Sequence, residues 1–286
     1  MSATIIDGRR IAAEIKKEVS AELDQLRSIY KINPSIASII IGEDESSKLY
    51  LRLRDKACLD IGIQTTQYMV PGDTSEGEIY RLIEELNNDP EVHGILLQLP
   101  LPKHLSLHRI LSKINPFKDV EGVTPYNIGT LITGEERIIP CTPMAVLRIL
   151  QHIEIPIKGS NIVIINHSHI VGKPLATIML NRDATVTICH IYTKNIKEYT
   201  VKADILVTAT GVPGLITEEY IKEGACVIDV GITKTSSGVR GDVDFETVKD
   251  KAGFLTPVPG GVGPVTIACS LLNMTKTFKL CMEMKK

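Results

Sequence analysis

Apolar residues recur with helical and strand-like spacing in alternation along the first third of the chain. A single apolar stripe predicts a helix from Arg9 to about Tyr30. The members of that stripe are Ile11, Ile15, Val19, Leu23 and Leu26. The pattern then predicts, in order, a strand at 35–41, a helix at 46–61, a strand at 64–70, a helix at 74–87 and a strand at 94–102. Strands that alternate with helices, without hairpin signals, predict an α/β fold with parallel sheets.

The second half of the chain repeats this alternation after a boundary marked by prolines. The run Pro140-Cys-Thr-Pro143 ends the first pattern, and Thr142 can cap a helix that runs to His152. Further strands are predicted at 161–165, 185–190, 205–208 and 226–229, and a last helix at 264–283. We therefore predict two domains, one of residues 1–139 with 267–286 and one of residues 140–266.

Composition and charge narrow the class of protein. The chain has 286 residues and a net charge of −2, so a nucleic acid is not an expected partner. No apolar run reaches the length of a membrane helix, and the first residues contain no signal peptide, so membrane insertion and secretion are not expected. The six cysteines form no C-x-x-C pair, which is typical of a reduced, cytoplasmic protein.

The predicted helix at 46–61 places polar chemistry beside a core. A serine at 46–47 can cap this helix, and Leu49 and Leu53 are expected to face the core. Tyr50 and Arg54 lie four residues apart and therefore stack on one face at the edge of that core. When this stretch is taken alone, an amphipathic helix whose Tyr and Arg cover apolar neighbours is the preferred interpretation.

Two further features of the first half suggest a ligand. Gln98 is a lone amide near the C-terminal end of a buried parallel strand, where open α/β sheets bind ligands. An amide satisfied by nearby backbone explains Gln98 about equally well. The loop at 115–124 carries Asp119 and Glu121 between turn residues, although acidic loops are usually just solvated.

A phosphate loop is predicted where the first strand of the second half meets its helix. The loop at 166–174 is not G-x-G-x-x-G, because Asn166 and Ser168 occupy the first two glycine positions. No acid follows on the next strand, where an enzyme that uses NAD usually binds the ribose hydroxyls. Histidines here and the Cys189–His190 pair could suggest zinc, but their spacing matches no usual ligand pattern, and no metal site is predicted.

The run at 256–266, T-P-V-P-G-G-V-G-P-V-T, has three prolines and three glycines within ten residues. So particular a backbone is typical of a loop wrapped around a flat ligand rather than of a plain connector.

With these motifs in place, the chain resembles the methylenetetrahydrofolate dehydrogenase/methenyltetrahydrofolate cyclohydrolase family. The resemblance covers nearly the whole length. Its motifs are S-x-x-Y at 47–50, G-I-L-L-Q-L-P-L-P at 94–102, K-D-V-E-G at 118–122, P-C-T-P at 140–143, S-x-I-V-G-K-P at 168–174 and P-V-P-G-G-V-G-P-V-T at 257–266. It implies an N-terminal α/β substrate domain, a Rossmann-type dinucleotide domain, a last helix that returns to the first domain, and a homodimer.

The resemblance also implies roles for particular residues. Tyr50 would stack on a tetrahydrofolate one-carbon derivative, and Gln98 would bind the active-site cation. The implied catalytic residues are Tyr50, Arg54, Gln98 and Glu121. The implied substrate contacts are Tyr50, Leu97, Gln98, Leu99, Pro259, Gly260, Gly261 and Val262. The implied cofactor contacts are Thr142, Asn166, His167, Ser168, Gly172, Ile191, Gly211 and Ile232.

The chain departs from the family's pattern at four of these positions. Arg54 stands where the family has a catalytic lysine, and Glu121 stands where it usually has an aspartate that binds the pterin. Asn166 replaces a glycine of the phosphate loop, and Ile191 replaces a residue that often binds the 2′-phosphate of NADP. Arginine effectively cannot release its proton, so the cyclohydrolase step is expected to be weak or absent while dehydrogenation is retained.

The expected activity is therefore oxidation of 5,10-methylenetetrahydrofolate with a nicotinamide cofactor. NADP is favoured over NAD because no acid repels a 2′-phosphate, with His167 and Lys194 as candidate phosphate partners. A fully bifunctional dehydrogenase/cyclohydrolase is one alternative. A nucleotide-sensing protein without catalysis and another two-domain dehydrogenase, such as a shikimate-type enzyme, are the others. A sensor has no need of a folate clamp, and the signature polar residues of the shikimate type are missing.

Overall fold

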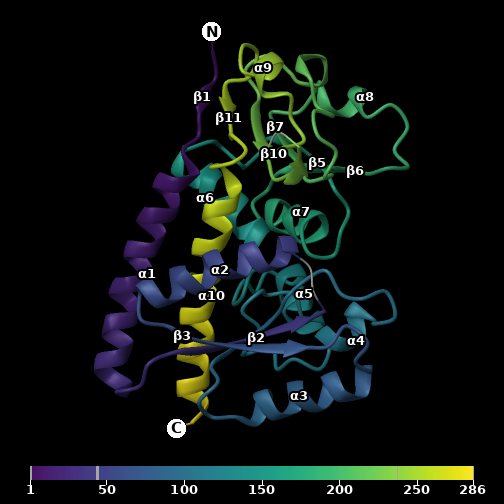
Figure 1. Ribbon diagram of the computed structural model, residues 1–286. Coiled ribbons are helices and arrows are strands. Elements are labelled where there is room, and N and C mark those ends of the chain that lie inside the picture. Colours follow the sequence, from purple (N-terminus) through teal and green to yellow (C-terminus); the bar gives the residue numbers. More distant parts are fainter. Residues whose placement is uncertain (1, 43–44, 237, 286) are drawn as a thin grey trace. The chain divides into compact units, whose positions relative to one another are not determined.

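The computed structural model describes residues 2–42, 45–236 and 238–285, with the side chains of 45–49 left out (Figure 1). The chain divides into two compact units. One consists of Met1–Ala13 and Thr142–Thr266, and we call it the six-stranded unit. The other consists of Glu14–Cys141 and Ile267–Lys286, and we call it the three-stranded unit.

The three-stranded unit is built on a parallel sheet in the order β3-β2-β4. Its strands are β2 (Ser35–Ile41), β3 (Gln64–Val70) and β4 (Gly94–Leu97). Its shorter helices are α2 (Glu45–Asp60), α3 (Glu76–Asn88), α4 (Leu107–Leu111) and α5 (Pro125–Ile132). One face of β2 and β4 packs against the buried isoleucines of α3 in a single apolar core. Six of the seven β2 residues are buried, as expected for a central parallel strand.

The six-stranded unit contains a parallel sheet in the order β1-β11-β8-β7-β5-β6. Its strands are β1 (Thr4–Ile5), β5 (Asn161–Ile165), β6 (Thr185–Cys189), β7 (Ile205–Thr208), β8 (Cys226–Asp229) and β11 (Phe254–Leu255). The strand order reverses between β5 and β7, because β6 lies on one side of β5 and β7 on the other. In open α/β sheets the crevice at such a reversal binds the ligand.

Smaller elements complete the six-stranded unit. They are α7 (Gly172–Leu180), α8 (Lys197–Thr200), η1 (Glu218–Tyr220), α9 (Phe245–Val248) and the antiparallel strands β9 (Thr233–Thr235) and β10 (Gly238–Arg240). Residues of β5, β6, β7, β8 and β11 share one apolar core cluster. None of the helices in the described ranges is long and apolar enough to cross a lipid bilayer.

Three helices pass from one unit to the other along the chain: α1 (Gly8–Tyr30), α6 (Cys141–His152) and α10 (Val262–Met284). The start of α1 is fixed by Asp7, whose Oδ1 accepts hydrogen bonds from the backbone N–H groups of Arg9 and Arg10 at 3.0 and 3.2 Å. All five members of the predicted apolar stripe of α1 are buried.

The predicted α/β class, with a Rossmann-like sheet and a C-terminal helix, is confirmed. Three details were wrong. The strand predicted at 94–102 ends at Leu97, and an antiparallel hairpin, β9–β10, is present where no hairpin signal was recognised. Leu53 is 50 % exposed rather than buried. The predicted cap at 46–47 and the placement of Leu49 lie outside the described side chains.

The predicted domain boundaries stay a prediction, and the compact units differ from them at the N-terminus. Residues 1–13 group with the six-stranded unit because β1 pairs with β11, with Thr4 opposite Phe254. Strand pairing of this kind depends on residues 250 positions apart, so local sequence pattern carried no signal for it.

Candidate functional site

The buried face of α2 carries an arginine. Leu51, Ala57 and Cys58 are at most 4 % exposed, and Arg54 lies among them with 3 % exposed. This face is rotated from the one that the leucine spacing predicted, so Arg54 sits inside the core boundary rather than at its edge. The Arg54 guanidinium lies over the Tyr50 ring, 4.8 Å from the ring centroid. The predicted stacking of these two side chains is present.

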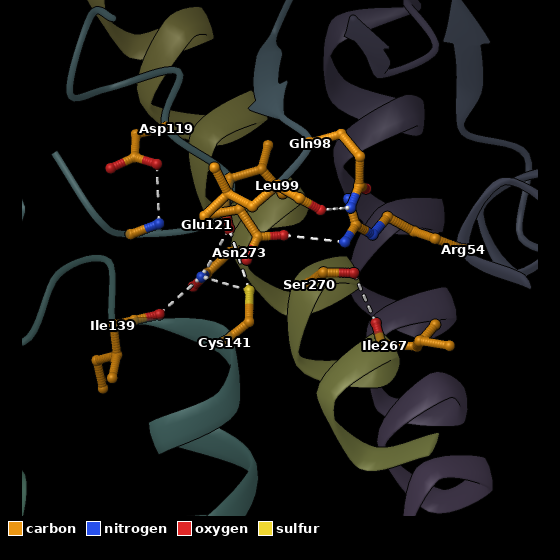
Figure 2. Close-up of polar contacts among 12 residues, drawn as sticks. Arg54, Gln98, Leu99, Asp119, Glu121, Ile139, Cys141, Ile267, Ser270 and Asn273 are labelled. Carbon is orange, nitrogen blue, oxygen red and sulfur yellow. Dashed lines mark hydrogen bonds and ion pairs between the residues drawn. The ribbon is translucent and has the colours of Figure 1, made fainter. Parts of the chain in front are cut away.

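Glu121 supplies the counter-charge to this buried guanidinium. Arg54 Nη2 lies 3.1 Å from Glu121 Oε1, and the Glu121 side chain is 27 % exposed (Figure 2). Burial by itself would lower the pKa of Arg54, but Glu121 and Tyr50 outweigh that effect and raise it above the ordinary value. Burial raises the pKa of Glu121, and the charge of Arg54 opposes that shift. The pair therefore presents a permanent cation held against a carboxylate.

Gln98 faces the same ion pair from the end of β4. Its backbone N–H still donates to Ile39 of β2 at 2.9 Å, and its Nε2 donates to the Leu99 carbonyl at 2.9 Å. In Figure 2 the Gln98 amide points toward the Arg54 guanidinium. Within the described part of the chain, Gln98 Oε1 and the Nε and Nη1 atoms of Arg54 are buried without hydrogen-bond partners. Unsatisfied buried polar atoms on convergent side chains indicate a place for a ligand.

Tyr50 completes the pocket without offering a mobile proton. The residue is partly buried, and burial raises the pKa of its phenol although the charge of Arg54 lowers it. Lys56, two positions after Arg54 on the same helix, is exposed. In this helix the cation in the pocket is therefore Arg54.

The loop at 118–124 is held by its own polar residues. Asp119 Oδ1 accepts from Gly122 N at 2.9 Å, and its Oδ2 accepts from Thr124 N at 2.8 Å and Asn127 Nδ2 at 2.9 Å. Lys118 Nζ donates to two carbonyls at the end of α3 and so belongs to the scaffold. Asp119 is thus occupied in shaping the loop, while Glu121 reaches Arg54.

Two residues that the motifs did not single out for a role lie behind Glu121. Asn273 of α10 donates from Nδ2 to the Val120 and Ile139 carbonyls at 2.9 and 2.8 Å (Figure 2). Cys141 donates from Sγ to the same Val120 carbonyl at 3.3 Å. Cys141 is buried, and burial raises its pKa well above the usual value. Asn273 gave no signal in the sequence, because an asparagine within an apolar helix has no recognisable spacing.

The predicted phosphate loop lies at the strand-order reversal of the six-stranded unit. Asn166 follows β5, and its Nδ2 donates to the Ala209 carbonyl just after β7 at 2.6 Å. Its Oδ1 accepts from Ser168 N at 2.8 Å and Gly172 N at 3.0 Å. A Cβ at Gly172 would lie 2.0 Å from the Asn166 carbonyl oxygen, so only glycine fits there. Asn166 therefore builds with its side chain a turn that glycines usually allow.

Two histidines meet beside this loop. The rings of His167, after β5, and His190, after β6, have centroids 4.8 Å apart. His190 Nδ1 accepts from the Tyr192 backbone N–H at 3.2 Å, so the neutral ring carries its proton on Nε2 and can donate from there. Ile191 is 84 % exposed. No group of three potential metal ligands occurs in the described residues.

Two buried aspartates tie together the other loops at this edge of the sheet. Asp229, the last residue of β8, accepts from Gly231 N and Val243 N, each at 2.9 Å. Asp242 accepts from Thr208 Oγ1 at 2.8 Å and from Thr210 N. These contacts place the segments that carry Gly211, which has a φ of 72°, and Ile232, which is 62 % exposed.

The loop at 256–262 is set by close backbone packing. Gly260 has a φ of 108°, and a Cβ at Gly261 would lie 2.5 Å from the Pro257 carbonyl oxygen. Pro259 is exposed, whereas Gly261 and Val262 are buried. A cavity of about 500 Å³ lies near the start of this loop, lined by Asp229, Thr256 and Pro257 among others, but by none of the predicted site residues.

Both parts of the chain match models of one protein family. Residues 6–121 match the model described as tetrahydrofolate dehydrogenase/cyclohydrolase, catalytic domain. Residues 140–282 match the model described as tetrahydrofolate dehydrogenase/cyclohydrolase, NAD(P)-binding domain. The chain belongs to the tetrahydrofolate dehydrogenase/cyclohydrolase family. This membership confirms the resemblance drawn from the motifs.

Several proteins of this family match the chain over nearly its full length. A protein of Methanosarcina barkeri named bifunctional protein FolD is 52% identical over 264 residues, 92% of each chain. The crystal structure of a bifunctional FolD methylenetetrahydrofolate dehydrogenase/cyclohydrolase from Campylobacter jejuni is 43% identical, with a TM-score of 0.94 over 98% of this chain and 99% of that one. A Trypanosoma brucei FolD complexed with NADP cofactor and inhibitor is 38% identical, with a TM-score of 0.94 over 99% of both chains.

The predicted tetrahydrofolate dehydrogenase/cyclohydrolase residues fall in both units. Tyr50, Arg54, Gln98 and Glu121 come together in the three-stranded unit. Leu97 is buried in the apolar core, so only its backbone is available to a ligand, while Leu99 is partly buried. In the six-stranded unit the structure brings together Asn166, Ser168 and Gly172, while Thr142 lies in the first turn of α6. The roles of all these residues stay predictions.

Proposed function

We propose that this protein oxidises 5,10-methylenetetrahydrofolate to 5,10-methenyltetrahydrofolate with NADP. The observation that carries the proposal is the pocket of Tyr50, Arg54 and Gln98, in the part of the chain that matches the family's catalytic domain. Its buried N–H groups and amide oxygen lack partners in the described protein and suit the polar edge of a pterin. The match of residues 140–282 to the NAD(P)-binding domain supports the cofactor.

In this proposal the chain mainly binds and orients the reactants. Bound NADP supplies the hydride acceptor. Tyr50 offers its ring face to the pterin, and Gln98 with Arg54 holds the polar atoms near the one-carbon bridge. Holding the two reactants in contact supplies much of the reduction in the activation barrier. Hydride transfer itself requires no side chain in this pocket that exchanges a proton with water.

The direct test is nicotinamide reduction, followed by absorbance, with methylenetetrahydrofolate and either cofactor. Reduction that depends on both substrate and enzyme supports the proposal. Folded protein that binds NADP but reduces none of it would favour the nucleotide-sensing alternative. Gln98→Leu is expected to lower kcat/KM about tenfold or more, because a polar group of the substrate would lose its partner.

We further propose NADP rather than NAD as the preferred cofactor. No acid follows β6, where the residues are His190, Ile191 and Tyr192. The paired rings of His167 and His190 lie beside the Asn166 turn, and the Nε2–H of His190 is available to a phosphate oxygen. His167→Ala and His190→Ala should each weaken binding of adenosine 2′,5′-bisphosphate more than binding of AMP. The exposed His108 provides the control, because His108→Ala should change neither.

The cyclohydrolase step is proposed to be weak. Hydrolysis of the methenyl carbon requires proton transfers, and Arg54 cannot release its proton. Burial raises the pKa of the Tyr50 phenol and of the Cys141 thiol, which removes both as bases near neutral pH. Glu121 could accept a proton only by giving up its ion pair with Arg54. General acid–base catalysis contributes about 10²–10⁴-fold, so its loss can suppress one activity and leave the other.

A double substitution tests this second proposal. Arg54 and Glu121 are both longer than the lysine and aspartate usual in the family, and their contact at 3.1 Å couples them. Arg54→Lys with Glu121→Asp should therefore restore more methenyl hydrolysis than the two single changes together predict. The starting measurement is hydrolysis by the unaltered protein above the buffer rate. A rate comparable to dehydrogenation would mean that the protein is fully bifunctional and would end this proposal.

A homodimer in the cytoplasm completes the proposal. All six cysteines are buried and none forms a disulfide, which suits a reducing compartment. Light scattering on the purified protein gives the assembly state directly, and a monomer across the working concentration range would contradict the dimer.

A further inference from the structure

Asn273 is the most completely enclosed polar side chain near Glu121. It is 0 % exposed, and its Nδ2 donates to the Val120 carbonyl at 2.9 Å and to the Ile139 carbonyl at 2.8 Å (Figure 2). The same nitrogen lies 3.5 Å from Cys141 Sγ. One amide group of α10 thus joins two chain segments, one before Glu121 and one before Cys141.

The backbone on both sides of Glu121 is held by this arrangement. Cys141 Sγ donates to the Val120 carbonyl at 3.3 Å, and Cys141 N donates to the Glu121 carbonyl at 3.3 Å. On the other side, Gly122 N donates to Asp119 at 2.9 Å. Neither peptide that flanks Glu121 can rotate without breaking one of these bonds.

The two segments also touch without room for adjustment. Gly122 has a φ of 69°, and a Cβ there would lie 2.7 Å from the Ile139 carbonyl carbon. The Glu121 backbone therefore cannot move toward 139–141, and Asn273 prevents it from moving away. The direction in which the Glu121 side chain leaves the backbone, toward Arg54, follows from this enclosure.

Asn273 has one feature that packing alone does not explain. Within the described residues its Oδ1 accepts no hydrogen bond, although the atom is buried. A buried acceptor without a partner costs about 1–3 kcal/mol. The two N–H groups of the amide explain why an asparagine stands here despite this penalty, because they donate to both carbonyls.

We propose that Asn273, assisted by Cys141, is a positioning residue that sets Glu121 against Arg54 and thereby shapes the pterin end of the substrate pocket. The proposal rests on the proposed function. It adds two residues that contact the backbone beside Glu121: Asn273 at the Val120 carbonyl, and Cys141 at the Val120 and Glu121 carbonyls.

A double-mutant cycle with Glu121→Gln tests the proposal, because an effect transmitted through Glu121 disappears once the carboxylate is gone. Two quantities are measured in each variant. The first is kcat/KM for methylenetetrahydrofolate oxidation, and the second is the Kd of methenyltetrahydrofolate, obtained from the change in the absorbance of that ligand on binding. Asn273→Ala should weaken both about tenfold in the native background and less than about twofold beside Glu121→Gln. An equal loss in both backgrounds would mean a merely structural role and would overturn the proposal.

Ser270 provides a matched control on the same helix. It is 1 % exposed, and its hydroxyl donates only to the Ile267 carbonyl at 2.7 Å within its own helix (Figure 2). Ser270→Ala should leave kcat/KM and Kd within about twofold, because no segment near Glu121 depends on that bond. A Ser270→Ala loss as large as that of Asn273→Ala would also overturn the proposal.

Cys141 provides a second pair of variants that do not depend on the folding of Asn273→Ala. Cys141→Ser keeps a donor to the Val120 carbonyl, whereas Cys141→Ala removes it. Serine should retain the Kd for methenyltetrahydrofolate and alanine should raise it several-fold; equal values for the two would contradict the proposal. Because Kd is measured without turnover, a protein that binds the folate but reduces no NADP would refute the proposed function and still decide this inference.

Discussion

The pocket of the three-stranded unit and the loop of the six-stranded unit are built in opposite ways. The pocket consists of side chains: Arg54, 3 % exposed, pairs with Glu121 and lies against Tyr50. The loop presents backbone N–H groups instead: the Asn166 side chain holds the N–H groups of Ser168 and Gly172 in a turn, while the nearby side chains of His167 and Ile191 are exposed.

This difference predicts which substitutions each part tolerates. A buried ion pair depends on both partners, since removing one leaves a charge without compensation in a low-dielectric surrounding. The conformation of such a turn depends on its glycine and on the group that holds it, whereas exposed side chains around it can change without disturbing that conformation. The departures from the expected family pattern fall in both parts: Arg54 and Glu121 face each other in the pocket, whereas Asn166 holds the turn and Ile191 is an exposed side chain near it.

The largest effect is expected from breaking the ion pair. Arg54→Met should lower the free energy of unfolding by roughly 3 kcal/mol, the low end for a buried pair, because Glu121 keeps some access to water. Urea denaturation measures the change. Arg52→Met is the control on the same helix, where the side chain is exposed, and should change stability by less than about 0.5 kcal/mol. Equal losses of unfolding free energy in the two variants would mean that the ion pair with Glu121 does not stabilise the fold.

In the loop held by Asn166, the substitution expected to be most damaging is that of Gly172. Gly172→Ala places a Cβ 2.0 Å from the Asn166 carbonyl oxygen, and we expect a loss of up to about 3 kcal/mol in stability. NADPH binding, followed by fluorescence, should weaken at least as much as it does in His167→Ala. Gly129→Ala is the control: it lies in α5 with open space around it, so alanine should stabilise that helix by about 0.5–1 kcal/mol. If His167→Ala does more damage to NADPH binding than Gly172→Ala, the loop depends on side chains after all.

Two buried groups, His93 and Asp229, should contribute to the pH dependence of stability with opposite sign. Burial lowers the pKa of His93, in the three-stranded unit, from 6.5 to about 4. Between those values the unfolded chain binds more protons, so the stability from His93 is complete above pH 6.5 and is lost as the pH falls toward 4. Burial raises the pKa of Asp229, in the six-stranded unit, from 3.8 to about 6, so its contribution falls as the pH rises through that window.

His93→Asn isolates the first of these contributions. Asparagine can still accept from Ser35 N, as His93 Nδ1 does at 3.3 Å, but it has no proton to gain. The difference in unfolding free energy between the two proteins should change by roughly 2 kcal/mol between pH 6.5 and 4, with His93 penalised at the acid end. A difference that stays constant across this range would show that His93 titrates normally.

The smallest effect concerns cofactor preference. Ile191→Arg should raise the ratio of kcat/KM for NADP over NAD about tenfold, since a guanidinium can pair with the 2′-phosphate. Stability should change by less than about 0.5 kcal/mol because Ile191 is 84 % exposed. Ile132→Arg, at an exposed position of the other unit, should leave the ratio unchanged. An unchanged ratio in Ile191→Arg would place the 2′-phosphate elsewhere.

Local pattern was sufficient for the longer helices and for most of the central strands, but not for β1, β11 or the β9–β10 hairpin. The strands at 35–41 and 64–70 were predicted to the residue, because short apolar or β-branched runs between turn signals have few other uses. The chemistry of Arg54 was also visible in advance: a guanidinium in place of an amine keeps charge and loses proton exchange in any fold.

The orientation of α2 was decided by tertiary structure. The spacing of Leu49 and Leu53 favoured one face, yet Leu53 is 50 % exposed and the face with Leu51 and Arg54 is buried. Helical periodicity gives the angles between side chains but not which of two mixed faces turns inward. The cost of burying the Arg54 charge is offset by Glu121, which comes from a loop distant in sequence.

The sequence by itself determined the family, the two α/β patterns and the unusual residue types at 54, 121, 166 and 191. Tertiary structure alone decided the partners: Asn273 with Val120, 153 positions away, and Asn166 with Ala209, 43 positions away. A hydrogen bond requires two groups within about 3 Å, and which distant groups come that close depends on how sheets and helices pack. Periodicity and propensity report only the nearest turns of the chain, so such partners leave no mark in local sequence.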